Sequence, residues 1–304
     1  MWVKKPTKRF LPSSRFPTNQ TLHYEIHHTT IYTYSSPVLL SPHTLKLRPR
    51  CDVTQQVRSF ALSIDPQPSR LCETLDLDGN NLLQVWFPET AVTSLTVQAT
   101  AEVTTLRGNP FDFLLEPWAT QLPIDYPASL LSQLQPYLSG YFGTLDPQAI
   151  ALAQEILQAT DDPITWLSEL NQRIYTTCRY TLRETGEPFS PGLTWQQQNG
   201  SCRDFAVLFM ETCRAIGLAT RFVSGYQEGE ADRDNHDLHA WAEVYLPGGG
   251  WRGYDPTQGL AVGDRYIAVY ASASARQTAP IWGTLQTKGA QSQMEYKLKV
   301  RAIE

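Results

Sequence analysis

Cys202 is the residue of this chain whose type and position are best suited to chemistry. Ser201 and Asp204 beside it have the spacing of a helix capping box, with Asp in place of the usual Glu or Gln, and apolar residues then recur at helical spacing as far as Ile216. A helix over 202–216 would hold the thiol at the positive end of its dipole, which favours the thiolate. The sequence therefore predicts an activated thiol. A small apolar residue at the end of a buried stripe is the alternative interpretation.

The other cysteines give no disulfide or metal pattern. Their odd number and the absence of CxxC spacing favour free thiols in a reducing compartment, so the expected location is cytoplasmic. Cys213 lies on the same helical stripe as Cys202 but roughly 16 Å further along the axis. We therefore expect it in the core. The five cysteines are Cys51, Cys72, Cys178, Cys202 and Cys213.

A base and a carboxylate follow downstream, in a segment with the pattern of a β-hairpin. Residues 238–246 alternate strictly, which puts His239 on one face of a strand, and a proline with three glycines then turns the chain back toward Asp255. A four-residue loop would pair Asp255 with Ala242, on the face away from the imidazole. A three-residue loop with a left-handed glycine would pair it with Trp241, roughly 7–8 Å from His239 and within side-chain reach. We therefore predict an odd-length loop or a bulge.

Other polar residues of this region are weaker candidates. His236 and His239 would face opposite sides of a strand, and no further ligand has usable spacing, so we expect no zinc site. The acidic run 228–234 lacks the turn glycine and the bidentate glutamate of a calcium loop, and we expect a solvated loop over the site entrance. Glu243 is expected to be solvated or paired with a neighbour such as Arg252 rather than to tune the imidazole.

The chain divides by pattern into three parts. Residues 1–20 are basic and lack the apolar stretch of a secretory leader, so we expect a flexible tail. Short alternating or β-branched runs separated by turn residues fill 21–110 and predict an antiparallel β-sandwich. Helical spacing follows in 146–159 and 163–175, and residues 111–304 are assigned to a second, catalytic domain.

The composition excludes two classes of protein. The 304 residues include 25 basic and 30 acidic side chains, a net charge of −5, so we expect no nucleic-acid partner. No stretch approaches the ~18 apolar residues that a membrane-spanning helix needs. Hydrophobic residues make up 41% of the chain, enough for conventional cores, and the length predicts about two domains.

Four blocks of sequence occur in a characteristic order, at residues 200–206, 214–226, 239–245 and 250–257. Together they closely resemble the core of the bacterial transglutaminase-like superfamily. The region before them is similar to the β-sandwich that precedes this core in a bacterial subgroup, on residues 28–34, 41–50 and 76–80. The resemblance implies an α+β fold, with an N-terminal antiparallel β-sandwich followed by a papain-like transglutaminase core. Residues 270–276 depart from the family, which often carries an Arg-Asp-Tyr-like motif there, and a supporting role for this segment is in doubt.

The same resemblance implies a Cys-His-Asp triad, with Cys202 as nucleophile, His239 as base and Asp255 orienting the imidazole. Such a site forms a thioester from an amide and needs no cofactor or metal. We expect a cysteine protease or amidase acting on peptides or proteins. A protein-glutamine transamidase and a catalytically retired peptide-binding module are the alternatives. The Cys202 N–H is the expected first oxyanion donor, and Trp195 or Gln196 the second, with core and surface positions as their alternative interpretations. The oligomeric state stays open.

Overall fold

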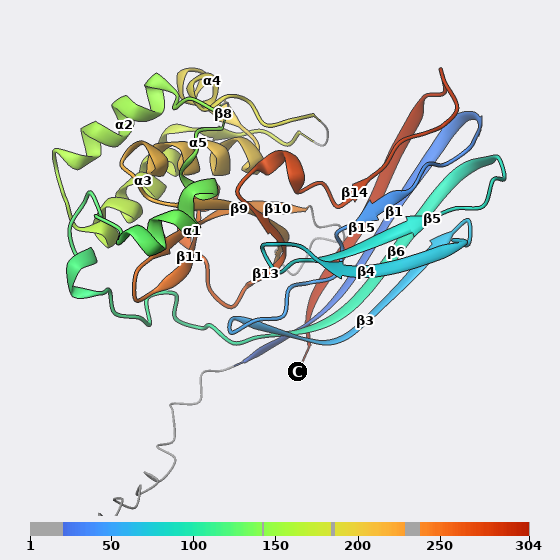
Figure 1. Ribbon diagram of the computed structural model, residues 1–304, viewed down its shortest axis with the longest axis horizontal. Coiled ribbons are helices and arrows are strands. Elements are labelled where there is room, and N and C mark those ends of the chain that lie inside the picture. Colours follow the sequence, from blue (N-terminus) through green and yellow to red (C-terminus); the bar gives the residue numbers. More distant parts are fainter. Residues whose placement is uncertain (1–20, 142, 184–185, 229–237, 304) are drawn as a thin grey trace, which may run out of the picture.

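The computed structural model describes residues 21–141, 143–183, 186–228 and 238–303. These residues form two lobes, one made of β-sheets and one in which helices cover a β-sheet (Figure 1). The predicted tail, residues 1–20, lies outside the described residues, as does His236 with most of the acidic run. None of the helices within the described residues is long and apolar enough to cross a membrane.

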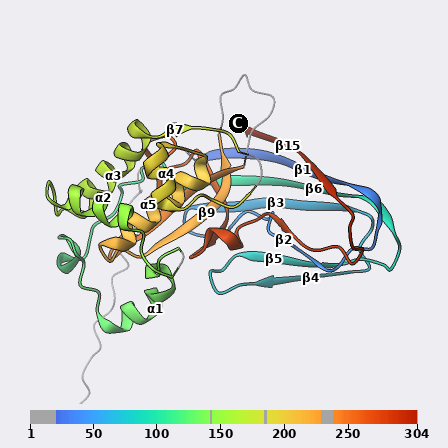
Figure 2. The ribbon, with the colours of Figure 1, turned by 90° about the horizontal axis from the view of Figure 1, so that it is seen from above.

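The first lobe is the predicted antiparallel β-sandwich. Its two sheets have the strand orders β15-β1-β6-β3 and β14-β2-β5-β4, and they form separate layers when seen from above (Figure 2). The strands are β1 (Leu22–Val38), β2 (His43–Leu45), β3 (Gln55–Asp65), β4 (Arg70–Leu75), β5 (Asn81–Trp86), β6 (Val92–Thr105), β14 (Ile281–Trp282) and β15 (Ser292–Ile303).

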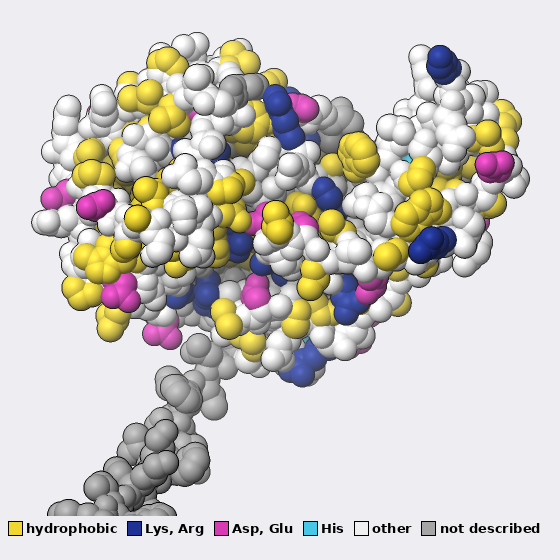
Figure 3. All heavy atoms as spheres, in the orientation of Figure 1, with side chains coloured by type: hydrophobic (Ala, Val, Ile, Leu, Met, Phe, Trp, Pro, Cys, Tyr) yellow, Lys and Arg dark blue, Asp and Glu magenta, His cyan; other side chains and the backbone are white. Residues whose placement is uncertain are grey.

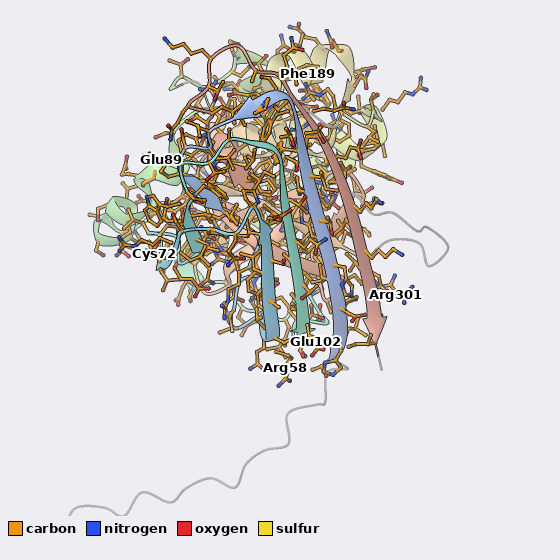
Figure 4. The ribbon with its side chains drawn as sticks, turned by 90° about the vertical axis from the view of Figure 1, so that its right-hand side faces the viewer. Arg58, Cys72, Glu89, Glu102, Phe189 and Arg301 are labelled. Carbon is orange, nitrogen blue, oxygen red and sulfur yellow. The ribbon has the colours of Figure 1, made fainter. Side chains whose placement is uncertain are left out.

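Alternation along the strands explains why the two sheets pack together. Inward-facing apolar side chains such as Val85, Leu95 and Val97 are buried between the layers. The opposite face of the β15-β1-β6-β3 sheet carries charged side chains, with Arg58 on β3 and Glu102 on the neighbouring β6 labelled in Figure 4. A sheet with one apolar and one charged face requires a partner on one side only.

The end of the chain returns to the sandwich, which differs from the predicted boundary. The sequence pattern places residues 111–304 in one catalytic domain, whereas β14 (Ile281–Trp282) and β15 (Ser292–Ile303) pair with β2 and β1 of the sandwich. β15 pairs with β1 in continuous antiparallel register from His23 with Ile303 to Tyr34 with Ser292. The physical reason is that β1 would otherwise leave a long row of backbone groups unpaired at the sheet edge.

The second lobe is built around a five-stranded sheet with the order β12-β11-β10-β9-β13. Its strands are β9 (Thr220–Gln227), β10 (His239–Leu246), β11 (Gly250–Asp255), β12 (Leu260–Ala261) and β13 (Tyr266–Ser272). A separate parallel pair of short strands, β7 (Arg179–Tyr180) and β8 (Asn199–Gly200), precedes these strands in the chain. The helices are α1 (Ala128–Leu138), α2 (Pro147–Leu157), α3 (Pro163–Thr177), α4 (Pro191–Gln197) and α5 (Cys202–Ala215), with short 3-10 turns at Pro117–Ala119 and Ala275–Gln277.

Helix α5 packs on β9 and β10 and is itself covered by the other helices (Figure 1). The predicted stripe from Cys202 to Cys213 is buried, but so are residues on the remaining faces. Glu211 is buried because it accepts hydrogen bonds from the backbone N–H groups of Tyr141 and Asp146, at 2.9 and 3.0 Å. The helix that carries the thiol is therefore central to the lobe.

The two lobes are joined along the free edge of β13. The Gln55 amide donates to the carbonyl of Ala268 at 2.9 Å and accepts from its N–H at 2.8 Å. Asn80 makes the same pair of bonds with Ala271, at 2.7 and 2.9 Å. These amides satisfy the edge of β13 as a neighbouring strand would. Beside them an apolar cluster spans both lobes, including Tyr24, Ile26, Val300, Tyr226, Ile267 and Val269.

Candidate active site

Cys202 is the first residue of α5 and is held there by the carboxylate of Asp204. This carboxylate is fully buried and accepts a hydrogen bond from the Ser201 N–H at 2.6 Å, as the capping pattern predicts, and a second from the Ser201 hydroxyl at 2.8 Å. It also accepts from the Phe189 N–H at 2.6 Å and forms an ion pair with Arg183 at 2.7 Å. The helix start is thereby fixed to the preceding loop, and the Cys202 N–H lies among those without an acceptor inside the helix.

The hairpin that carries the histidine and the aspartate has the predicted odd-length loop. Leu246 pairs with Gly250, so the loop has three residues, and Gly248 and Gly250 have φ of +86° and +69°. Glycine is required there because other residues rarely adopt positive φ. The prediction of a three-residue loop with a left-handed glycine is confirmed. Continued by one residue, this register puts Asp255 opposite Trp241.

The side chains of His239 and Asp255 meet as that register requires. His239 Nε2 lies 2.7 Å from Asp255 Oδ2. The Cys202 thiol interacts with the same imidazole, and both side chains line one cleft. His239 therefore contacts Asp255 directly and lies beside Cys202.

The electrostatics of the three groups favour a charged imidazole. Burial alone would lower the pKa of His239, but the negative charge of Asp255, its hydrogen bond, and the interaction with Cys202 together raise that pKa to about 10. The imidazolium form of His239 is therefore stabilised beside the Asp255 carboxylate and the Cys202 sulfur.

Tyr266 is a site residue that sequence reasoning missed. Its hydroxyl donates to Asp255 Oδ2 at 2.9 Å, while the Thr257 N–H donates to Oδ1 at 2.9 Å. Gln227 in turn donates to the Tyr266 hydroxyl at 3.2 Å. Burial and the adjacent carboxylate raise the pKa of Tyr266, so the phenol stays a donor. Tyr266 lies on β13, and its proximity to Asp255 depends on which strand β13 pairs with in the sheet. No local sequence pattern around Tyr266 indicates that pairing.

A cleft of about 570 Å³ opens over the thiol, between the two lobes. Cys202, His239 and Ser224 belong to the wall on the helical lobe, and His28 and Thr30 on β1 belong to the sandwich wall. The molecular surface is hollowed between the lobes (Figure 3). Cys202 itself is 7% exposed, so a substrate must enter the cleft to meet the sulfur.

The remaining candidates lie away from the reacting groups. Glu243 is paired, as expected, but with Arg221 at 2.6 Å rather than with Arg252. Neither suggested second oxyanion donor lines the cleft, since Trp195 packs against the core and Gln196 is exposed. Cys213 is fully buried, as predicted, and burial raises the pKa of its thiol. Within the described ranges no group of His, Cys, Asp and Glu side chains is arranged to hold a metal ion.

The segment 270–276, which departs from the family motif, has a structural task. The backbone carbonyl and N–H of Ala271 are hydrogen-bonded to the side-chain amide of Asn80 where the two lobes meet. Arg276 forms an ion pair with Glu187 at 3.0 Å, and both line the cleft. The segment thus connects the sandwich to the cleft wall.

Comparison with known proteins gives matches over most of the chain. Residues 24–104 match the bacterial transglutaminase-like N-terminal region, and residues 150–256 match the transglutaminase-like superfamily. An uncharacterized protein of Mycobacterium tuberculosis is 28% identical over 96% of this chain and 96% of its own length. A protein-glutamine gamma-glutamyltransferase of Pseudomonas aeruginosa is 33% identical over 126 residues, 38% of this chain and 19% of that protein.

The fold has a close counterpart among solved structures. A candidate cysteine protease from Cytophaga hutchinsonii superposes with a TM-score of 0.73 at 20% identity, over 94% of this chain and 92% of that one. At this identity the likeness shows the fold. The predicted fold class, a sandwich followed by a transglutaminase-like core, is confirmed.

Proposed function

Because the chain belongs to the transglutaminase-like superfamily, we propose that it is a thiol acyl-transfer enzyme that hydrolyses amide bonds of peptides or proteins. Cys202 is the nucleophile, His239 the general base and acid, and Asp255 the group that orients the imidazole. The observation that carries the proposal is the imidazole of His239, which lies 2.7 Å from the Asp255 carboxylate and lines one cleft together with Cys202.

The reaction follows the general chemistry of such a triad. His239 accepts the thiol proton, and the Cys202 sulfur attacks the amide carbonyl to give a tetrahedral oxyanion, toward which the Cys202 N–H donates. The carbon–nitrogen bond then breaks as His239 returns the proton to the leaving amine, and a thioester remains. Water attacks the thioester with His239 as base, which releases the acid and regenerates the thiol.

We place hydrolysis first for the second half of the reaction, in which water resolves the thioester. The assay below tests it against amine transfer.

Transamidation is the second candidate, since the Pseudomonas aeruginosa relative named as a protein-glutamine gamma-glutamyltransferase is 33% identical over 126 residues. The assay that separates the two supplies a glutamine-containing peptide library and a labelled primary amine. We expect ammonia or a cleaved peptide, an acid product, and no incorporated label. Cys202→Ala should abolish product, while Cys72→Ala should retain it. Label incorporated into the peptide in place of acid would establish transamidation.

A catalytically retired module would be recognised by its thiol. We expect iodoacetamide at pH 6 to alkylate Cys202 faster than the exposed Cys51, because the imidazolium of His239 stabilises the thiolate. Equal or slower alkylation of Cys202, together with no turnover of any library member, would refute the enzymatic proposal.

A further inference from the structure

Large apolar side chains gather, exposed, around the cleft that contains the thiol. Trp282 is 61% exposed and Leu182 is 51% exposed, and both line this cleft with Cys202. Trp282 lies on β14 of the sandwich, whereas Leu182 follows β7 in the helical lobe. Single exposed apolar residues are common on protein surfaces, but here two large ones line the same cleft from separate lobes.

Further apolar side chains of the sandwich line the same cleft. Met294 on β15 is directly opposite Tyr32 on β1, and both side chains line the cleft. Ile281, next to Trp282, lines it as well. These residues come from strands fixed by backbone pairing, so the wall is preformed.

The charged groups of the cleft are engaged within the protein. Arg183 is ion-paired with the buried Asp204 at 2.7 Å, and Arg276 with Glu187 at 3.0 Å. Arg203 donates to the Gly186 carbonyl at 2.7 Å. Two of these guanidinium groups thus bind the neighbouring residues Gly186 and Glu187 at the edge of the cleft.

We propose that Trp282 and Leu182 form a specificity pocket, which selects acyl donors with a bulky apolar side chain next to the reacting carbonyl. This inference rests on the proposed function and names its substrate class, an apolar or aromatic peptide segment. The side chain packs between the lobes while the carbonyl meets Cys202. An apolar pocket changes the reaction rate by roughly 10- to 200-fold for one methylene group gained or lost in the side chain that it binds. A preference for acidic side chains, drawn by the arginines, is the competing outcome.

The test uses acyl-aminoacyl chloromethyl ketones that differ only in one side chain: phenylalanine, alanine or glutamate. The Cys202 sulfur displaces chloride to form a thioether, which mass spectrometry locates, so that turnover is not needed. Each rate is divided by the iodoacetamide rate of the same protein. We expect the phenylalanine probe to react at least about tenfold faster than the alanine probe. Trp282→Ala and, separately, Leu182→Ser should each reduce that ratio severalfold.

The matched control is Trp118→Ala, which removes an exposed tryptophan outside the cleft and should leave the ratio unchanged. Equal rates for the phenylalanine and alanine probes, a faster glutamate probe, or a ratio that survives both cleft substitutions would overturn the pocket. In those cases iodoacetamide would still label Cys202, and the proposed function would stand. Absence of labelling by iodoacetamide and by every probe would instead refute the proposed function, and the pocket with it.

Discussion

Replacing His28 with glutamine should make the protein less sensitive to mild acid. His28 lies on β1 with 2% of its surface exposed, and its ring nitrogens lie 3.0 Å from the Tyr226 hydroxyl and 3.2 Å from the Thr30 hydroxyl. Burial lowers the pKa of His28 from 6.5 to about 4. The folded state therefore keeps a neutral imidazole that the unfolded state would protonate.

The size of the effect follows from that difference in pKa. Stability is fully present above pH 6.5 and is lost as the pH falls toward 4, because only the unfolded chain binds the proton in that window. Between pH 7.5 and pH 5 the loss from this one group is about 2 kcal/mol. In His28→Gln this contribution is absent, so the free energy of unfolding should fall by about 2 kcal/mol less between the two pH values.

Urea denaturation at pH 7.5 and pH 5 measures, for the wild type and for the variant, how far the free energy of unfolding falls between the two pH values. Any effect of the substitution that is the same at both pH values cancels in this comparison. The matched control is His27→Gln, which removes an imidazole with 49% side-chain exposure from the same strand and should behave like the wild type. If His28→Gln loses as much stability on acidification as the wild type, the buried neutral imidazole is not the cause and the reasoning is wrong.

Three further substitutions test the geometry of the site. Tyr266→Phe removes a donor to the Asp255 carboxylate, a bond of about 1.5–3 kcal/mol, so kcat/KM should fall at least about tenfold. The carboxylate then interacts more strongly with the imidazolium of His239, so the basic limb of the pH–rate profile should move to higher pH, whereas Tyr254→Phe should change neither. Gly225→Ala would place a Cβ against the Ile267 carbonyl and the Trp241 ring, in the residue paired with His239, and a loss of about 2–3 kcal/mol is expected in urea unfolding. An unchanged midpoint would contradict the packing. Gly248→Ala would place a Cβ against the Leu114 carbonyl at a φ of +86°, so it should destabilise the fold by about 1–3 kcal/mol and reduce activity. Full activity would count against the three-residue loop as the feature that sets the register.

The elements nearest the thiol were predictable because their causes are local. The helix expected over 202–216 spans Cys202–Ala215, since its cap and its apolar spacing lie within the same segment. The contact of His239 with Asp255 could also be anticipated, because a short glycine loop fixes the register between them. Burial of α5 on all sides could not, since polar residues such as Glu211 find their partners far along the chain.

What escaped prediction depends on which strands become neighbours. Tyr266 reaches Asp255 because β13 adds to the sheet beyond β9, a choice that no residue near Tyr266 dictates. The place of β15 in the sandwich has the same origin, since it pairs with β1, more than 250 positions earlier. Its alternating pattern predicts a strand but not a partner.

The position of β14 and β15 in the chain has a consequence during synthesis. The ribosome releases Cys202, His239 and Asp255 before residues 281–303, and domains generally fold in the order in which they emerge. Until β14 and β15 have been made, β1 retains an open edge and the cleft lacks the part of its wall that Ile281, Trp282 and Met294 supply. A nascent chain at that stage carries Cys202, His239 and Asp255 beside an incomplete cleft, and the pairing of β14 and β15 with the sandwich completes it.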